Sequence, residues 1–245
     1  MGMIGTSREG DVFTIELQRP ERRNALNTEI CELVREETEK SITDGARAIV
    51  ITGQGSSFCA GADLSGDAYA DGFTDTLFEM LHTIDSVPVP VVAAINGPAI
   101  GAGTVLALAA DLRVVAPEAR FAIPAAKLGI SVDRWTVHRL AALIGGGPAR
   151  TILLGAEEIG ADEALLRGLA NKLGDLEVAQ QWAHSISQLA PLSLQHLKMV
   201  LNDDDTQSPP PPEQLAALHA AWKSYDAQEA RKARAENRPP VFRGR

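Results

Sequence analysis

The chain has 245 residues, of which 45% are hydrophobic and 22% are charged. This balance supports a sizeable buried core and excludes long disordered stretches as the default expectation. The formal net charge of −9 argues against nucleic acid or an anionic membrane as the main partner. An anionic ligand stays compatible with this charge where basic residues gather locally.

The use of cysteine and histidine predicts neither disulfides nor metal. Two cysteines, Cys31 and Cys59, are too few for a disulfide framework, and the five histidines show no ligand spacing. The apolar residues around Cys59 predict a buried structural thiol rather than a nucleophile. A reducing, cytoplasmic compartment fits this composition. We expect no membrane span, because no run of about 18 apolar residues occurs.

Short β-branched runs alternate with amphipathic stretches in the first part of the chain, joined by Gly and Pro turns. Such alternation favours an α/β architecture. In chain order, the predicted elements are a strand at 12–17, a helix at about 28–43 with Asn27 as N-cap, buried strands at 48–52 and 91–95, a helix between 101 and 110, and a strand at 112–115.

Amphipathic helices take over after about residue 174, where the strand signals stop. The Pro-rich segment at 208–212 predicts a short extended linker, and one final helix is predicted over 214–236. We therefore expect a core at 1–190 and a helical region at 191–245. A loop at 67–75, with glycines nearby, is expected to border a ligand pocket.

Two segments of small residues carry the clearest sign of chemistry. They are FCAGADL at 58–64 and NGPAIGAG at 96–103, and the second runs from a buried strand into a helix. A helix start exposes backbone N–H groups at the positive end of the helix dipole. A second small-residue turn facing it would give two donors converging on one oxygen, an oxyanion hole. On spacing alone, ordinary tight strand-to-helix turns are the favoured alternative.

Colinear motifs over nearly the whole chain resemble the crotonase superfamily of enoyl-CoA hydratases and isomerases. The matching stretches are RPERRNAL at 19–26, AGADL at 60–64, NGPAIGAG at 96–103, ADLR at 110–113, FAIP at 121–124, LG at 128–129 and RPPVF at 238–242. The resemblance implies a spiral of ββα units and a helical C-terminal trimerisation region that builds trimers or hexamers. It also implies acyl-CoA as the ligand, with no further cofactor.

The resemblance also implies the site residues. By the family pattern, the N–H groups of Ala62 and Ala102 bind the thioester oxygen. Lys232 and Arg234 are candidates for the CoA phosphates, with a solvated helix face as the alternative. The residues implied to line the acyl-CoA path are Arg23, Ala25, Leu26, Ala60, Gly61, Asp63, Leu64, Gly101, Pro124 and Leu128.

The sequence departs from the family pattern at the positions that perform hydration. Hydratases of this superfamily use two glutamates, and the corresponding residues here are Val105 and Ala125. Neither side chain exchanges protons, and general acid–base groups contribute about 10²–10⁴-fold each. Asp133 is the remaining ionisable candidate, since dienoyl-CoA isomerases and a CoA-thioester dehalogenase place a working aspartate at a position that looks the same. The alternative for Asp133 is a helix N-cap.

Two functions follow as hypotheses. The first is a non-hydrating acyl-CoA binder or carrier in fatty-acid metabolism, which would hand its acyl group to a fatty-acid synthesis enzyme. The second is an enoyl-CoA isomerase or hydratase-type enzyme with Asp133 as its acid/base. A partner-binding scaffold, based on the helical arm and the Pro-rich segment, is a weaker third alternative.

Overall fold

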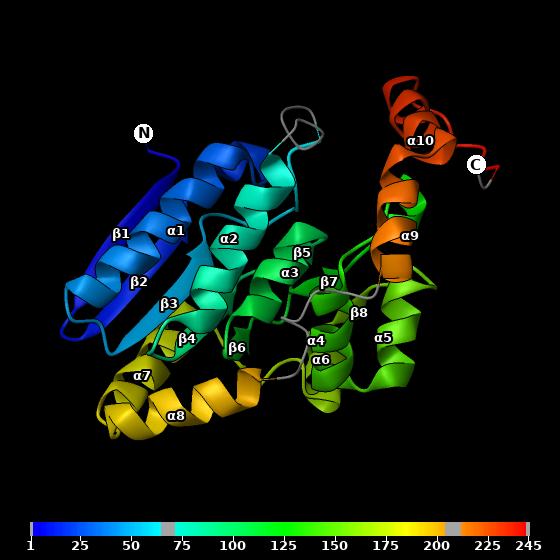
Figure 1. Ribbon diagram of the computed structural model, residues 1–245. Helices are drawn as coiled ribbons and strands as arrows, with labels where there is room; N and C mark the ends of the chain where they lie inside the picture. The colour runs from blue at the N-terminus through cyan, green and yellow to red at the C-terminus, as the bar shows by residue number, and fades with distance from the viewer. Residues whose placement is uncertain (1, 65–71, 204–211, 244–245) are drawn as a thin grey trace. The chain divides into compact units, whose positions relative to one another are not determined.

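The computed structural model describes residues 2–64, 72–203 and 212–243, and its architecture is mixed α/β (Figure 1). The chain forms two compact units. Unit 1 comprises Met1–Phe121 and Ile159–Asn202, and unit 2 comprises Ala122–Glu158 and Asp203–Arg245. The boundaries of these units differ from the single boundary predicted near residue 190. Residues 122–158 group with the C-terminal helices instead.

A six-stranded sheet forms the centre of unit 1, in the order β1-β2-β3-β4-β6-β9. β1 pairs antiparallel with β2, and every later pair is parallel. The strands are β1 Ile4–Glu9, β2 Val12–Leu17, β3 Ala48–Gly53, β4 Val91–Ile95, β6 Leu112–Val115 and β9 Lys172–Leu173, and a short second sheet contains β5 Ala99–Ile100, β7 Arg120–Ala122 and β8 Ile159–Gly160.

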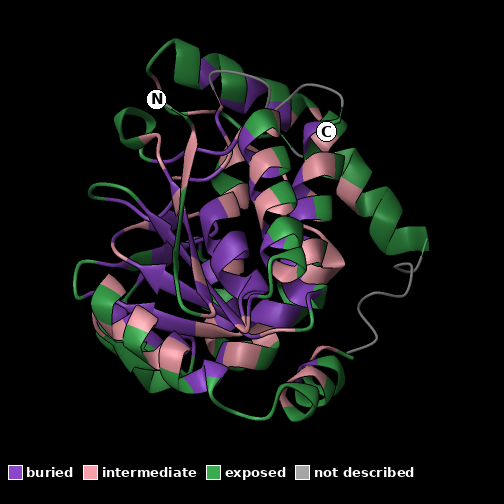
Figure 2. Ribbon diagram, turned by 90° about the vertical axis from the view of Figure 1, so that its left-hand side faces the viewer, coloured by how far each residue is buried: buried purple, intermediate pink, exposed green. Residues whose placement is uncertain are grey.

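Helices cover both faces of the larger sheet, which explains why its inner strands are mostly apolar. On one face, Val50, Val92 and Val114 pack with Ala179 and Ala183 of α7. The other face meets α1, against which α2 packs. Figure 2 shows that the inner strands are mostly buried. The helices of unit 1 are α1 Thr28–Thr43, α2 Phe73–Ser86, α3 Ala102–Ala109, α6 Ala161–Arg167, α7 Leu176–Ser187 and α8 Pro191–Asn202.

A buried lysine anchors α8 to the rest of unit 1. Lys198 Nζ lies 2.8 Å from the Asp111 carboxylate, and the two side chains are only 6% and 18% exposed. Lys198 also donates to the carbonyl oxygens of Ile84 and Val89, each at 3.1 Å. Because these donors are satisfied, the ammonium is tolerated away from solvent.

Unit 2 corrects one helix prediction. The single helix expected over 214–236 is wrong, because Ser224 separates α9 from α10. The Ser224 hydroxyl accepts a hydrogen bond from Ala227 N at 3.0 Å and so caps α10. The helical elements of unit 2 are the 3₁₀ helix η3 Ala125–Leu128, α4 Arg134–Ile144, α5 Gly146–Leu153, α9 Pro212–Lys223 and α10 Tyr225–Ala235.

Two predicted segments fall largely outside the described residues. The Pro-rich linker at 208–212 lies there except for Pro212, which begins α9. The loop predicted at 67–75 lies there up to residue 71. The loop prediction is wrong for residues 73–75, because these residues already belong to α2.

Candidate functional site

Parallel strands place the loops that follow them along one edge of the sheet. The segments after β2, β3 and β4 therefore meet beyond the carboxyl ends of these strands, where open α/β sheets bind ligands. These segments contain the motifs at 19–26, 58–64 and 96–103. Two isolated parallel bridges join them, between Leu26 and Ala62 and between Cys59 and Ala99.

The hydrogen bonds of the first bridge orient the amide of Ala62. Leu26 N donates to Gly61 O at 2.8 Å, and Asp63 N donates to Leu26 O at 2.7 Å. The groups on both sides of Ala62 thus bond to Leu26, so the N–H of Ala62 points to the opposite side of its segment. Within the described part of the chain, this N–H has no acceptor, and Ala62 is half-buried.

The second bridge brings the start of α3 against the same segment. Cys59 N donates to Pro98 O at 3.2 Å, and Ile100 N donates to Cys59 O at 2.9 Å. Ala102 is the first residue of α3, where helix N–H groups lack intrahelical partners. Its amide likewise has no acceptor among residues 2–64, 72–203 and 212–243.

Gly61 lies where these two segments are closest. A Cβ atom at this position would lie 2.6 Å from Ile100 O and 3.5 Å from Ala102 N, and the φ angle of Gly61 is +96°. Both the space and the backbone conformation therefore require glycine. The amides of residues 62 and 102 consequently come from neighbouring chain segments, and their role as a donor pair stays a prediction from the family resemblance.

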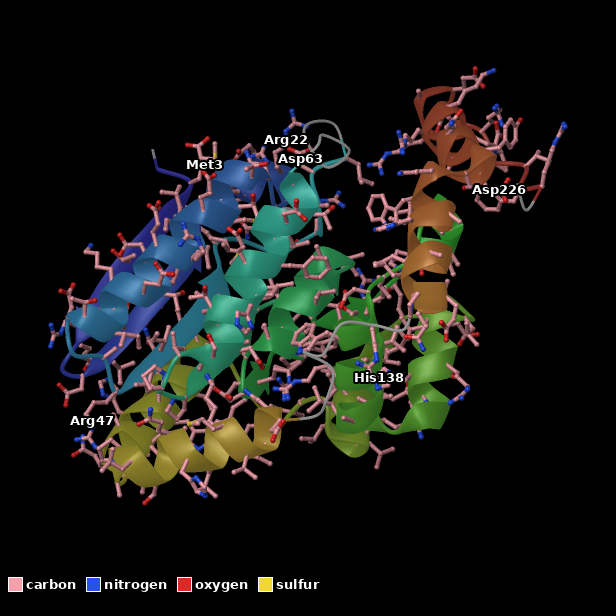
Figure 3. The ribbon with its side chains drawn as sticks, in the orientation of Figure 1. Met3, Arg22, Arg47, Asp63, His138 and Asp226 are labelled. Carbon is pink, nitrogen blue, oxygen red and sulfur yellow. The ribbon has the colours of Figure 1, made fainter. Side chains whose placement is uncertain are left out.

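Asp63, the residue that follows Ala62, forms an ion pair with Arg19. Arg19 Nη1 lies 2.7 Å from Asp63 Oδ2, and the two side chains are only 17% and 10% exposed (Figure 3, with Asp63 labelled). The same nitrogen donates to Ala25 O at 3.2 Å. The motif analysis did not single out Arg19, and no local signal pairs it with Asp63, because the pairing arises only when β2 and β3 lie side by side.

Asn24 holds the loop from which Arg19 extends. Its carboxamide oxygen accepts from Arg19 N at 3.0 Å, and its nitrogen donates to the carbonyl oxygens of Gln54 and Ser57 at 2.9 and 2.8 Å. Asn24 is fully buried with a left-handed φ of 57°, a conformation that asparagine tolerates better than most residues. The loop after β2 is therefore fastened to the loop after β3.

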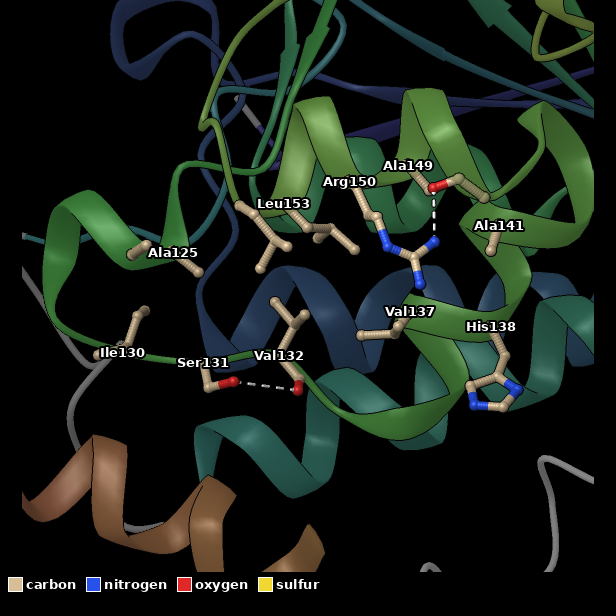
Figure 4. Close-up of a pocket in the computed structure, with 13 residues that line it drawn as sticks. Ala125, Ile130, Ser131, Val132, Val137, His138, Ala141, Ala149, Arg150 and Leu153 are labelled. Carbon is tan, nitrogen blue, oxygen red and sulfur yellow. Dashed lines mark hydrogen bonds between the residues drawn. The ribbon is translucent and has the colours of Figure 1, made fainter.

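A hollow of about 520 Å³ lies in unit 2 between η3, α4 and α5 (Figure 4). Its walls are mostly aliphatic or small side chains, among them Ala125, Val137 and Leu153. The basic lining residues are His138 and Arg150, and Arg150 Nη1 donates to Gly146 O at 2.9 Å. None of the described lining residues is acidic, so the hollow supplies apolar surface without a carboxylate.

Comparison with known proteins identifies the family. The family model for enoyl-CoA hydratase/isomerase matches residues 7–245. A probable enoyl-CoA hydratase, echA6, of Mycobacterium leprae is 52% identical, covering 99% of this chain and 100% of its own length. The 2,3-dehydroadipyl-CoA hydratase of Escherichia coli is 34% identical over the full length of both chains. The chain belongs to the enoyl-CoA hydratase/isomerase family.

Solved structures of the family share the fold. The carnitinyl-CoA hydratase of Mycobacterium avium superposes with a TM-score of 0.89 at 32% identity, covering 99% of both chains. EchA1_1 of Mycobacterium paratuberculosis superposes with a TM-score of 0.88 at 34% identity, with the same coverage. The crotonase-like fold expected from the motifs is thereby confirmed.

Val105 and Ala125, the two positions where the sequence is predicted to depart from the hydratase pattern, lie in different units. Val105 is buried in α3, one turn after Ala102, with its amide bonded to Gly101 O at 3.1 Å. Ala125 begins η3 in unit 2 and lines the hollow there. Neither position offers a proton donor or acceptor in its side chain.

Asp133 is the N-cap of α4. Its Oδ1 accepts from Thr136 N at 2.9 Å, and its Oδ2 accepts from the Thr136 hydroxyl at 2.5 Å. Both carboxylate oxygens are thus used by one residue of the first helical turn. The structure therefore shows Asp133 as a helix cap. An acid/base role for this residue stays a prediction.

The other residues of the family pattern divide between the two units. The structure brings together the motifs from Arg23 to Ala102 in unit 1, where Leu26 is fully buried and contributes through its backbone. Pro124, Leu128 and Asp133 belong to unit 2. Lys232 and Arg234 are exposed on α10, and Lys232 lies 3.9 Å from Glu236.

The two thiols are buried, as expected for Cys59. Burial is the main cause that raises the pKa of Cys31 and of Cys59 to about 12. Both therefore stay protonated at neutral pH, and a nucleophilic role has no support. Among the described residues, no cluster of three metal-binding side chains occurs, and none of the helices there is long and apolar enough to cross a bilayer.

Proposed function

We propose that this member of the enoyl-CoA hydratase/isomerase family binds CoA thioesters and lacks efficient hydratase chemistry. The observation that carries the proposal is the pair of amides at Ala62 and Ala102. They come from adjacent segments and have no acceptor among the described residues. Unsatisfied N–H groups are rare in folded proteins, and such a pair suits a ligand oxygen.

Hydration needs more than a polarised carbonyl. Water must be deprotonated near C3 of an enoyl thioester while a proton is delivered to C2. By the family pattern, the residues for these steps would stand at Val105 and Ala125, which carry no ionisable group. Losing both could lower the rate by about 10⁴-fold or more, although such effects are not additive.

The alternative function is an enoyl-CoA isomerase or hydratase-type enzyme that uses Asp133 as acid/base, with migration of a double bond as its first candidate reaction. Its carboxylate would then have to exchange its contacts with Thr136 for contacts with the substrate. Those contacts fix the first turn of α4, so the exchange carries a cost that a dedicated acid/base would not. The binding proposal requires no such rearrangement.

The proposal places the protein in fatty-acid metabolism as an acyl-CoA carrier. The apolar walls of the hollow in unit 2 are compatible with an acyl chain. A homotrimer or hexamer, and transfer of the acyl group to a fatty-acid synthesis enzyme, belong to the same proposal. A cytoplasmic location is part of it too.

Calorimetry and an enzyme assay on one preparation test the proposal. Dodecanoyl-CoA should bind with a Kd on the order of 1–10 µM. Crotonyl-CoA should keep its enoyl absorbance under conditions in which an authentic hydratase removes it. Turnover faster than about one per second would contradict the absence of efficient hydration, and no binding of any acyl-CoA would contradict the whole proposal.

A further inference from the structure

We propose that Arg19 is a positioning residue that holds the Ala62 amide ready for a thioester oxygen, acting through Asp63. This inference rests on the proposed function. It assigns a task to a buried ion pair that contacts the backbone of Ala25 on one side of the bridge between Leu26 and Ala62 and involves the side chain of Asp63 on the other. Arg19 itself makes no contact with the reacting atoms in this proposal.

The contacts of Arg19 span the two segments of that bridge. Nη1 donates to Ala25 O at 3.2 Å on one segment and pairs with Asp63 Oδ2 at 2.7 Å on the other. Ala25 precedes Leu26, and Asp63 follows Ala62 in sequence. The guanidinium therefore links the neighbours of both bridged residues, and the link limits rotation of the peptide plane that carries the Ala62 N–H.

The position of Arg19 is itself fixed. Its backbone N–H donates to the Asn24 carboxamide at 3.0 Å, and Asn24 N donates to Arg19 O at 2.9 Å. The Asn24 side chain is tied in turn to Gln54 and Ser57. A rigid base of this kind allows a side chain to hold a neighbouring amide within a few tenths of an ångström of the productive geometry.

Charge supplies a second reason for the pair. Asp63 is one residue from the proposed donor, and a bare carboxylate there would repel negative charge developing on a thioester oxygen. Pairing with Arg19 neutralises this carboxylate while leaving the amide unshielded. The planar guanidinium can contact a carboxylate and a carbonyl together, which a lysine ammonium does with less geometric control.

Two ligands that differ only at the carbonyl oxygen isolate the contribution of hydrogen bonds to that oxygen. Dodecanoyl-CoA carries the thioester oxygen, whereas dodecyl-CoA, the matching thioether, lacks it. Two hydrogen bonds to the oxygen should make the wild-type protein bind the thioester about tenfold or more tightly than the thioether. The ratio of the two Kd values cancels contacts made to the CoA moiety and to the chain.

Arg19→Lys and Asp63→Asn are the informative variants. Each should lower the thioester-to-thioether ratio to about twofold or less while changing thioether affinity by less than about threefold. An infrared difference spectrum of ¹³C=O-labelled dodecanoyl-CoA gives a second readout. The carbonyl band should shift to lower frequency in the wild-type complex, and less in either variant.

Lys198→Met is the matched control for lost stability. It breaks another buried ion pair of unit 1, whose partners are Asp111, Ile84 and Val89. This control should lower the melting temperature and leave the Kd ratio at its wild-type value. If Arg19→Lys and Asp63→Asn also kept the wild-type ratio and carbonyl band, the positioning role would be refuted. A wild-type ratio near one would instead refute the amide pair of the proposed function.

Discussion

Glu229 of α10 and Arg238 beyond its end form a two-point ion pair in unit 2. Nη1 lies 2.6 Å from Oε1, and Nη2 lies 3.1 Å from Oε2. Oε1 also accepts from Val241 N at 3.0 Å. Because one carboxylate binds both the side chain and the backbone of the terminal segment, it fastens that segment back onto α10.

This pair predicts a defined dependence of stability on pH. The hydrogen bond from Arg238 is the main cause that lowers the pKa of Glu229 to about 2, from an ordinary value of 4.5. A carboxylate with a lowered pKa stabilises the fold above its unfolded pKa and loses that contribution as the pH falls through its folded pKa. The stabilisation should therefore be complete above about pH 5 and decline between about pH 4.5 and pH 2.

Urea unfolding of the full chain at several pH values checks this prediction. The difference in unfolding free energy between wild type and Glu229→Gln should be largest at pH 6–7 and shrink steadily toward pH 3. Glu236→Gln is the control, since it removes another carboxylate bonded to Arg238, at 2.6 Å, that is half exposed. Exposed pairs contribute about 0–1 kcal/mol. A difference for Glu229→Gln that does not vary with pH would contradict the assignment.

Several elements could be predicted because their signals are local. β4 at Val91–Ile95 and β6 at Leu112–Val115 match their predicted bounds, since buried strands in a covered parallel sheet are rich in apolar and β-branched residues. α1 also starts where Asn27 predicts, because the cap bonds Ile30 N at 3.0 Å. Capping is a property of a few consecutive residues, so one sequence is enough to reveal it.

Features that depend on tertiary contact were not predictable in the same way. β1 is largely exposed and polar, and its pairing with β2 comes from position at the sheet edge rather than from hydrophobic alternation. The break at Ser224 lies between two stretches that each favour helix. The amides of Ala62 and Ala102 were proposed from the family motifs, whereas the ion pair of Arg19 with Asp63 became visible only in the folded loops.

Substitution of Asp133 separates capping from chemistry. Asparagine caps helices about as well as aspartate, so Asp133→Asn should change the unfolding free energy by only a few tenths of a kcal/mol, and Asp133→Ala should cost about 1 kcal/mol. Both variants should bind dodecanoyl-CoA like wild type. If Asp133→Asn kept its stability and lost a measurable double-bond migration, Asp133 would be an acid/base and the isomerase alternative would gain.

Gly61→Ala should damage thioester binding through a specific clash. The new methyl group would lie 2.6 Å from Ile100 O and would force apart the segments that carry Ala62 and Ala102. We expect the Kd for dodecanoyl-CoA to rise by about tenfold or more. Gly45→Ala is a matched control, because Gly45 also has a positive φ of +87° but has no atom within 4 Å of the added Cβ.

Both glycine variants should lose stability, but only one of them should lose affinity for the thioester. Each places alanine in a left-handed conformation, worth about 1–2 kcal/mol of stability. Only Gly61→Ala should raise the Kd in calorimetry, while both should lower the melting temperature. Equal affinities for the two variants would show that the approach of Gly61 to α3 has no part in binding.

Placing carboxylates at positions 105 and 125 tests the proposed lack of efficient hydration. The double variant Val105→Glu with Ala125→Glu should hydrate crotonyl-CoA at least about 10²-fold faster than wild type, because a general acid–base pair contributes on this scale. Val105 is only 5% exposed, so the new carboxyl at 105 is expected to cost a few kcal/mol of stability.

The control is Val105→Gln with Ala125→Gln, which has nearly the same volume and no acid–base function. A gain with glutamate and none with glutamine would mean that the amides of Ala62 and Ala102 already hold the substrate and that proton transfer is what the natural chain lacks. No gain in either variant, with binding intact, would mean that the site is shaped for a thioester but not for its hydration.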